Sequence, residues 1–143
     1  DCASVARTAK VIADGGFKKS GDIVKALAAG ADFVVLGSML AGTDETPGEV
    51  LKKDGKLYKK YRGMASEEAQ LDWRGRCSVS EGICATVPYR GKLSAVLEEI
   101  EGGVRSGFSY SGARNIGELR ARARFLKQTA SAQVESNTHI LYR

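Results

Sequence analysis

The chain of 143 residues has the length of one domain, and its 43% hydrophobic and 27% charged residues are ordinary for a globular protein. Because it contains no run of about 18 apolar residues, and no apolar stretch near residue 1, we expect neither a membrane span nor a signal peptide. The net charge of +5 mildly favours an anionic ligand, although basic residues scattered over a solvated surface explain it better. No basic cluster is specific enough to predict nucleic-acid binding.

The first predicted elements are a strand, a helix and a second strand. Apolar runs at residues 10–13 and in "DFVVLG" (32–37) predict the two strands. Between them Ser20 is expected to cap a helix with Asp22 in its first turn and Gly30 at its C′ position. Its inward face is expected to hold Ile23, Val24, Leu27 and Ala28. This succession predicts a βαβ unit with a parallel sheet covered on both faces.

The segments that follow are less regular. "VLKKDGKLYKKY" (50–61) predicts a hairpin around the turn dipeptide Asp54-Gly55, "RGMASEEAQ" (62–70) a short helix, and "LDWRGRCSVSEGICA" (71–85) a loop or flap. An amphipathic helix then starts in "KLSAVLEEI" (92–100), and Asn115 is expected to cap another in 115–129. The inward side chains of the first of these helices are expected to be Leu93, Val96, Leu97 and Ile100. The tail from residue 130 is polar and predicted to be irregular.

The cysteines, Cys2, Cys77 and Cys84, form no CxxC motif and no Cys/His cluster, which argues against a disulfide framework and against zinc. We therefore expect reduced thiols in a cytoplasmic protein. A Ser-His-Asp or Cys-His mechanism would have to use His139, close to the last residue, and we do not expect one.

Glycines stand where two neighbouring parallel strands would end, at Gly15, Gly16 and Gly37. Without Cβ atoms, their backbone N–H groups can approach an anion closely, and in a (β/α)8 barrel the loops after strands 7 and 8 are the usual phosphate site. Asp14 can accept hydrogen bonds from ribose hydroxyls, and Ser38 can donate to a phosphate. The pair of glycine ends therefore predicts a binding site, the alternative being ordinary strand-to-loop turns.

Four stretches in this order resemble the C-terminal part of the IMP dehydrogenase / GMP reductase family: "IADGGFKKSGDIVKALAAGADFVVLGSMLAGTDETPGE", "YKKYRGMASEEA", "EGICATVPYRGKL" and "GGVRSGFSYSGA". The resemblance implies an α/β fold, the C-terminal portion of a (β/α)8 TIM barrel with strands 7–8 and their helices. Residues 1–143 would be part of one catalytic domain, with 41–91 as an active-site loop or flap insertion. A closed barrel needs about 200 residues or more, so we expect a missing N-terminal half of the same polypeptide, and the family is usually a homotetramer.

The resemblance also implies the residues that bind a purine nucleoside monophosphate, GMP or IMP. Asp14 would hold the ribose, and the phosphate would contact Gly15, Gly16, Gly37, Ser38 and Tyr61. The purine would face the backbone of Gly63, Met64 and Ala65. Glu81 would be the catalytic carboxylate at the base edge, beside Ser80 and Gly82, where it can accept or relay protons. Without the resemblance, a solvated loop glutamate would be the preferred interpretation.

Both branches of this family work through a thioimidate between a loop cysteine and purine C2, with hydride passing to or from a nicotinamide. The family's cysteine lies in a Ser-x-Cys-x-Thr loop after strand 6, and this sequence contains no such loop. Neither Cys2, Cys77 nor Cys84 has that context. We therefore expect the nucleophile in the missing half.

The resemblance favours the GMP reductase branch, which converts GMP to IMP and ammonia with NADPH. An IMP dehydrogenase, which converts IMP to XMP with NAD, carries a long flap with an Arg-Tyr pair that activates water. Here the interval "EEAQLDWRGRCSV" (67–79) is short and has no such pair. Ser106 and Ser109 in "RSGFSY" also resemble the reductase's cofactor contacts, the alternative being a turn after a helix.

Two features favour the dehydrogenase instead. "TDETPGE" (43–49) is closer to its pattern, and "VESNTHI" (134–140) is similar to a segment whose carbonyls hold potassium across a subunit interface. Glu135, Ser136 and Asn137 would be those positions. Arg74 or Arg76 would then have to replace the missing base. A further alternative is a non-catalytic purine-nucleotide-binding remnant.

Overall fold

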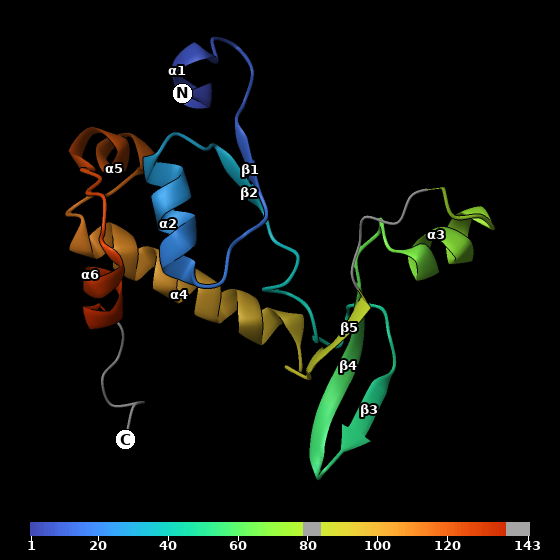
Figure 1. The fold of residues 1–143 in the computed structure, drawn as a ribbon. Helices are drawn as coiled ribbons and strands as arrows, with labels where there is room; N and C mark the ends of the chain where they lie inside the picture. Colours follow the sequence, from blue (N-terminus) through green and yellow to red (C-terminus); the bar gives the residue numbers. More distant parts are fainter. Residues whose placement is uncertain (79–83, 137–143) are drawn as a thin grey trace.

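The computed structural model describes residues 1–78 and 84–136 (Figure 1). The helices in this part are α1 (Cys2–Val5), α2 (Ser20–Ala28), α3 (Glu67–Arg74), α4 (Leu93–Tyr110), α5 (Ile116–Arg122) and α6 (Ala130–Glu135). The strands are β1 (Ile12–Asp14), β2 (Phe33–Val35), β3 (Val50–Lys53), β4 (Lys56–Arg62) and β5 (Cys84–Pro88). They form a parallel β1–β2 pair and an antiparallel sheet in the order β3–β4–β5. None of the described helices is long and apolar enough to cross a membrane.

The predicted βαβ unit is confirmed, because β1 and β2 pair in parallel and α2 connects them. The start of α2 differs from the prediction: Lys19 is the N-cap, and Ser20 is already the first helical residue. The reason is Asp22, whose carboxylate accepts hydrogen bonds from the N–H groups of Lys18 and Lys19 at 3.2 and 3.3 Å. This carboxylate takes the place of a capping hydroxyl. Gly30, with φ of +113°, follows the end of the helix as predicted.

The core lies on one face of the β1–β2 pair. Phe17, Ile23 and Met39 form a buried cluster, against which Ala13 of β1 and Val34 of β2 pack, together with Leu27 of α2 and Ile100 and Val104 of α4. The opposite face is exposed, since Phe33 keeps 58% and Val35 47% of its accessible surface. Within the described residues, helices α2 and α4 cover only one face of the pair, and coverage of the other face stays a prediction.

Helix α5 is fixed to the βαβ unit through one arginine. The Arg120 guanidinium donates to the carbonyls of Leu27 and Ala31 at 3.1 and 2.8 Å, and it lies 3.3 Å from the Asp32 carboxylate. The N–H of Val11, followed by Arg120, holds the pKa of Asp32 below its usual range. Asn115 caps α5 as predicted, accepting from the N–H of Glu118 at 2.9 Å. This prediction of a capped helix is confirmed, although the helix ends at Arg122.

The antiparallel sheet confirms the predicted hairpin. Asp54 and Gly55 both have positive φ, 50° and 75°, the values of a two-residue type I′ turn between β3 and β4. Residues 71–85, predicted as a loop, instead include the second half of α3 and the first residues of β5. Tertiary pairing explains the strand, because Cys84 and Ala85 pair with Arg62 and Tyr61 of β4.

Two further expectations about helices are wrong, and one alternative is excluded. The alternative interpretation of residues 105–110, a turn after a helix, does not hold, because α4 continues to Tyr110. Leu97 is 45% exposed rather than inward, whereas Val96 is 4% exposed and forms the buried contact. The tail is helical at Ala130–Glu135, where the hydroxyl of Thr129 caps α6 by accepting from the N–H of Ala132 at 3.2 Å.

Candidate functional site

The ends of β1 and β2 lie side by side, as the glycine pattern predicts. Asp14 pairs with Val35 in the parallel ladder, and the N–H of Gly15 donates to the Val35 carbonyl at 3.3 Å. Gly15 and Gly16 have φ of +71° and +79°, a conformation that side chains rarely adopt. Because the N–H of Gly15 is used by the sheet, Gly16 carries the amide that remains available at this end. No described hydrogen bond uses it.

The chain turns tightly after β2. The carbonyl of Gly37 accepts hydrogen bonds from the N–H groups of Leu40 and Ala41 at 3.0 and 3.2 Å. These bonds form a single turn whose first N–H groups, those of Gly37 and Ser38, make no hydrogen bond to the described residues. Amides at the start of such a turn carry partial positive charge and bind anions. The second glycine end therefore has the chemistry of a phosphate site.

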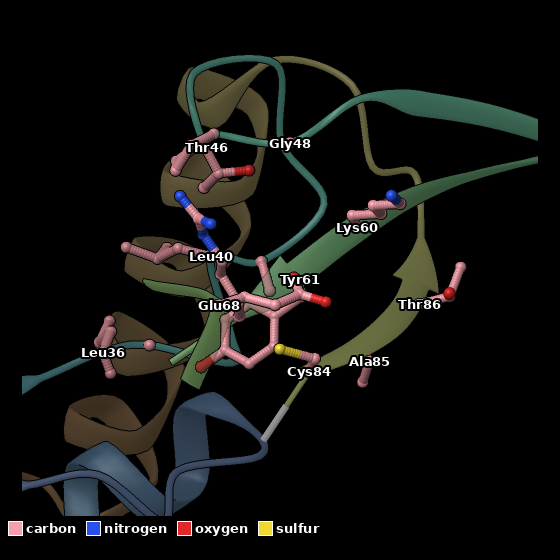
Figure 2. A pocket seen from close by; sticks show the side chains of 14 residues that line it. Leu36, Leu40, Thr46, Gly48, Lys60, Tyr61, Glu68, Cys84, Ala85 and Thr86 are labelled. Carbon is pink, nitrogen blue, oxygen red and sulfur yellow. The ribbon is translucent and has the colours of Figure 1, made fainter. Parts of the chain in front are cut away.

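A cavity of about 640 Å³ opens beside this turn (Figure 2). Gly37 lines it from the end of β2, and Tyr61 lines it from β4. A Cβ atom on Gly37 would lie 3.6 Å from the Tyr61 hydroxyl oxygen, so the phenol stands directly next to the glycine. The structure thus brings together two residues predicted to contact one phosphate. Asp14, Gly15, Gly16 and Ser38 do not line this cavity.

Sequence reasoning missed other residues of the same cavity. Arg62, Glu68 and Cys84 line it from β4, α3 and β5. Arg62 is paired with the carboxylate of Asp72, which raises the pKa of the guanidinium further above its usual range. The ion pair ties β4 to α3 across the cavity rim. No local sequence signal marks these residues, because they meet only through the pairing of β4 with β5 and the ion pair between β4 and α3.

Two basic side chains hold the loop that follows the glycine turn. Lys59 is 4% exposed, and its ammonium donates to the carbonyls of Thr43 and Asp44 at 2.7 and 3.0 Å. Arg90 donates to the carbonyl of Met39 at 2.5 Å. Neither cation lines the cavity. They instead fix the backbone that follows Gly37 and Ser38, at Met39, Thr43 and Asp44.

The segment that directly follows β4, next to the cavity, consists of Gly63, Met64 and Ala65. Met64 is 72% exposed, and the carbonyl of Gly63 accepts from the N–H of Ser66 at 2.9 Å in the turn that starts α3. The carbonyl of Ala65 accepts from the side-chain amide of Gln70 at 3.0 Å. These backbone groups are therefore held in a defined conformation at the position predicted for the purine.

A family model described as the IMP dehydrogenase / GMP reductase domain matches residues 1–139 of the chain. The chain belongs to this family. It is 47% identical to the GMP reductase of Leishmania major and 44% identical to the inosine-5′-monophosphate dehydrogenase of Nitrosopumilus maritimus, each over 97% of this chain. A crystal structure of a cysteine-to-alanine variant of GMP reductase from Trypanosoma brucei, in complex with guanosine 5′-monophosphate, matches 96% of the chain with 49% identity and a TM-score of 0.87.

The chain spans 31% and 32% of the length of those two curated relatives and 30% of the crystallised chain. The match confirms the family resemblance and the fold, a C-terminal portion of the family's barrel. Members of the family are oxidoreductases of purine nucleotides, and both names that the sequence suggests occur among the relatives.

Several site residues expected from the family lie outside the described residues. These are Ser80, Glu81, Gly82 and Asn137, and His139 lies there as well. Within residues 1–78 and 84–136, no group of three His, Cys, Asp or Glu side chains is placed to hold a metal ion. Glu135 and Ser136 lie at the C-terminal end of α6, where backbone carbonyls carry partial negative charge. Such carbonyl groups fit a weakly hydrated monovalent cation, so the potassium site stays a prediction.

The expected cofactor contacts are both exposed on α4. Ser106 and Ser109 are three residues apart and therefore lie on neighbouring positions of one helix face. Ser109 also lines a second cavity of about 950 Å³, together with Arg105 and Phe108. A hydroxyl, a guanidinium and an aromatic ring fit a dinucleotide, which combines phosphates with flat rings.

Proposed function

We propose that this chain is the nucleotide-binding part of a GMP reductase, which converts GMP to IMP and ammonia with NADPH. The observation that carries the proposal is α3 (Glu67–Arg74). It occupies most of the interval that would hold the water-activating flap of a dehydrogenase, and Arg62 and Asp72 tether it to β4. Ammonia release needs no activated water, so a short, helical segment suits the reductase. The likeness to a GMP reductase solved with GMP supports the same substrate.

In this proposal the chain's own residues bind and orient the nucleotide. Phosphate is held by the N–H groups of Gly16, Gly37 and Ser38 and by the Tyr61 hydroxyl, while Asp14 accepts from the ribose. The backbone of residues 63–65 faces the purine. Glu81 accepts or relays a proton at the base edge, with Ser80 and Gly82 beside it.

The remaining parts of the proposal concern groups beyond this chain. NADPH supplies the hydride and is contacted by Ser106 and Ser109. The nucleophilic cysteine lies in an N-terminal half of the same polypeptide, and the active enzyme is a cytoplasmic homotetramer. Potassium, where required, is bound by carbonyls of residues 135–137.

The second candidate is an IMP dehydrogenase that uses NAD. It is favoured by 50% identity to the inosine-5′-monophosphate dehydrogenase of Aquifex aeolicus over 90% of this chain. The base would then be Arg74 or Arg76, which line a small cavity of about 350 Å³ with Cys77 and Ser78. The third is a nucleotide-binding remnant without catalysis.

An absorbance assay of the complete enzyme at the reduced-nicotinamide band separates these candidates. One cuvette holds GMP and NADPH, and the other holds IMP and NAD⁺. Loss of absorbance with GMP alone is the expected result. A gain with IMP and no reaction with GMP would establish the dehydrogenase. No absorbance change in either cuvette, together with tight GMP binding, would establish the non-catalytic nucleotide-binding remnant.

A further inference from the structure

We propose that Gln70 is a positioning residue, which holds the purine-facing backbone at Ala65 and the start of the Glu81 segment at Ser78 in one fixed arrangement. The inference rests on the proposed function, because it concerns the same nucleotide site. Gln70 does not line the cavity itself. It acts through the two backbone segments that it joins.

The contacts of Gln70 connect two segments that are separate in the sequence. Its side-chain nitrogen donates to the carbonyl of Ala65 at 3.0 Å. Its side-chain oxygen accepts from the N–H of Ser78 at 3.3 Å and from the Ser78 hydroxyl at 3.4 Å. One carboxamide therefore bonds both to Ala65, which immediately precedes the N-cap of α3, and to Ser78, which lies three positions before Glu81 in the sequence.

The setting makes this carboxamide rigid. Gln70 is 5% exposed, and its own N–H donates to the carbonyl of Ser66 at 3.0 Å within the first turns of α3. Ser66, 1% exposed, caps the same helix by accepting from the N–H of Ala69 at 3.3 Å. A buried polar side chain is costly unless it is hydrogen-bonded. An apolar side chain would fill this place at less cost, so the two-ended hydrogen bonding is the feature that needs a role.

Helix α3 lies away from the core formed by α2 and α4 (Figure 1). Among the described residues, the side-chain hydrogen bonds that join α3 to its surroundings are those of Gln70 and of the Arg62–Asp72 ion pair. Ser78 itself is exposed, so packing does little to fix where it lies relative to Ala65. The carboxamide supplies that constraint, and small displacements of reacting groups are expensive in rate.

The test is steady-state kinetics of the complete enzyme carrying Gln70→Met, which keeps the length and volume of the side chain and removes both hydrogen bonds. We expect kcat to fall about tenfold or more, since misplacement by about 1 Å can cost up to about 100-fold. The KM for GMP should change less than about threefold, because the phosphate turn is held by other residues. Glu67→Gln, on the exposed first turn of α3, is the matched control and should match the wild-type enzyme.

Two further measurements make the outcome decisive. Ser78→Ala removes only the weaker hydroxyl contact and keeps the N–H bond, so it should lower kcat less than Gln70→Met does and have no further effect in that variant. A lower Tm with unchanged kcat in Gln70→Met would reduce Gln70 to a structural residue and overturn the proposal. Where Gln70→Met does not fold, Gln70→Glu decides, because it keeps the acceptor for Ser78 and removes the donor to the Ala65 carbonyl: an unchanged kcat contradicts positioning. Inactivity of the wild-type enzyme on GMP contradicts the proposed function instead.

Discussion

At the scale of single residues, the least expected feature is a buried lysine that pairs with carbonyls and with no carboxylate among the described residues. Lys59 directs its ammonium at the carbonyls of Thr43 and Asp44, just beyond the glycine turn. Replacing it with methionine leaves both acceptors without their donor, and a buried acceptor left unsatisfied costs about 1–3 kcal/mol. We expect Lys59→Met to lower the free energy of unfolding by about that amount and to weaken GMP binding, because the loop carrying Ser38 loosens.

Chemical denaturation and GMP titration of the complete enzyme measure both effects. Lys56→Met is the matched control, because Lys56 lies on the same strand and is exposed, and it should change stability by less than about 0.5 kcal/mol. Equal losses in the two variants would show that the hydrogen bonds of Lys59 contribute nothing.

The residue scale also shows what the sequence can predict of the site. The strand-end glycines are predictable because a glycine after an apolar strand permits either close approach of the backbone or a turn with positive φ, whereas Tyr61 is predicted by the family resemblance alone. Arg62, Glu68 and Cys84 are not, because they meet only through the pairing of β4 with β5 and through the Arg62–Asp72 ion pair. Adjacent lysines at 59 and 60 look alike in the sequence, yet one is buried and the other exposed.

At the scale of elements, the contact between α2 and α4 depends on two glycines of α4. A Cβ on Gly103 would lie 2.1 Å from the hydroxyl oxygen of Ser20, and one on Gly107 would lie 2.5 Å from a methyl carbon of Val24. Glycine costs about 1 kcal/mol in a helix relative to alanine, and the close packing of the two helices offsets it. Tertiary packing therefore explains glycines inside a helix, where local propensity disfavours them.

This contact gives a prediction with an internal control. Gly107→Ala should destabilise the protein by about 1–3 kcal/mol, because the added methyl group overpacks the interface. Gly102→Ala, one position before the packed pair and with no atom within 4 Å of the added Cβ, should stabilise by about 0.5–1 kcal/mol through helix propensity. Thermal unfolding of both variants checks the signs. A stabilised Gly107→Ala would mean that α2 and α4 can separate without loss.

At the scale of the whole molecule, the described chain has two parts that meet at the loop of residues 39–46. One part is the βαβ unit with α4 and α5, and the other is the β3–β4–β5 sheet with α3 (Figure 1). Thr43, fully buried, bridges to Gly91, and the Glu45 carboxylate accepts from the N–H of Leu93 at the start of α4. The turn at Gly37 and Ser38 directly precedes this loop, so in the proposed function the phosphate of the nucleotide binds where the two parts join.

Hydrogen exchange of the complete enzyme, with and without GMP, tests this arrangement. Without nucleotide, we expect the slowest exchange in β2, α2 and α4 around the buried cluster, and the fastest in α6, which contains no buried residue, since stability follows local burial. Added GMP should slow exchange at residues 15–16 and 37–41, and along β4 through Tyr61, because the ligand stabilises the state that binds it. Added GMP should leave the exchange rates of α5 and α6 unchanged. Protection confined to α5 and α6, with none at 37–41, would place the nucleotide elsewhere and would make the phosphate assignment wrong.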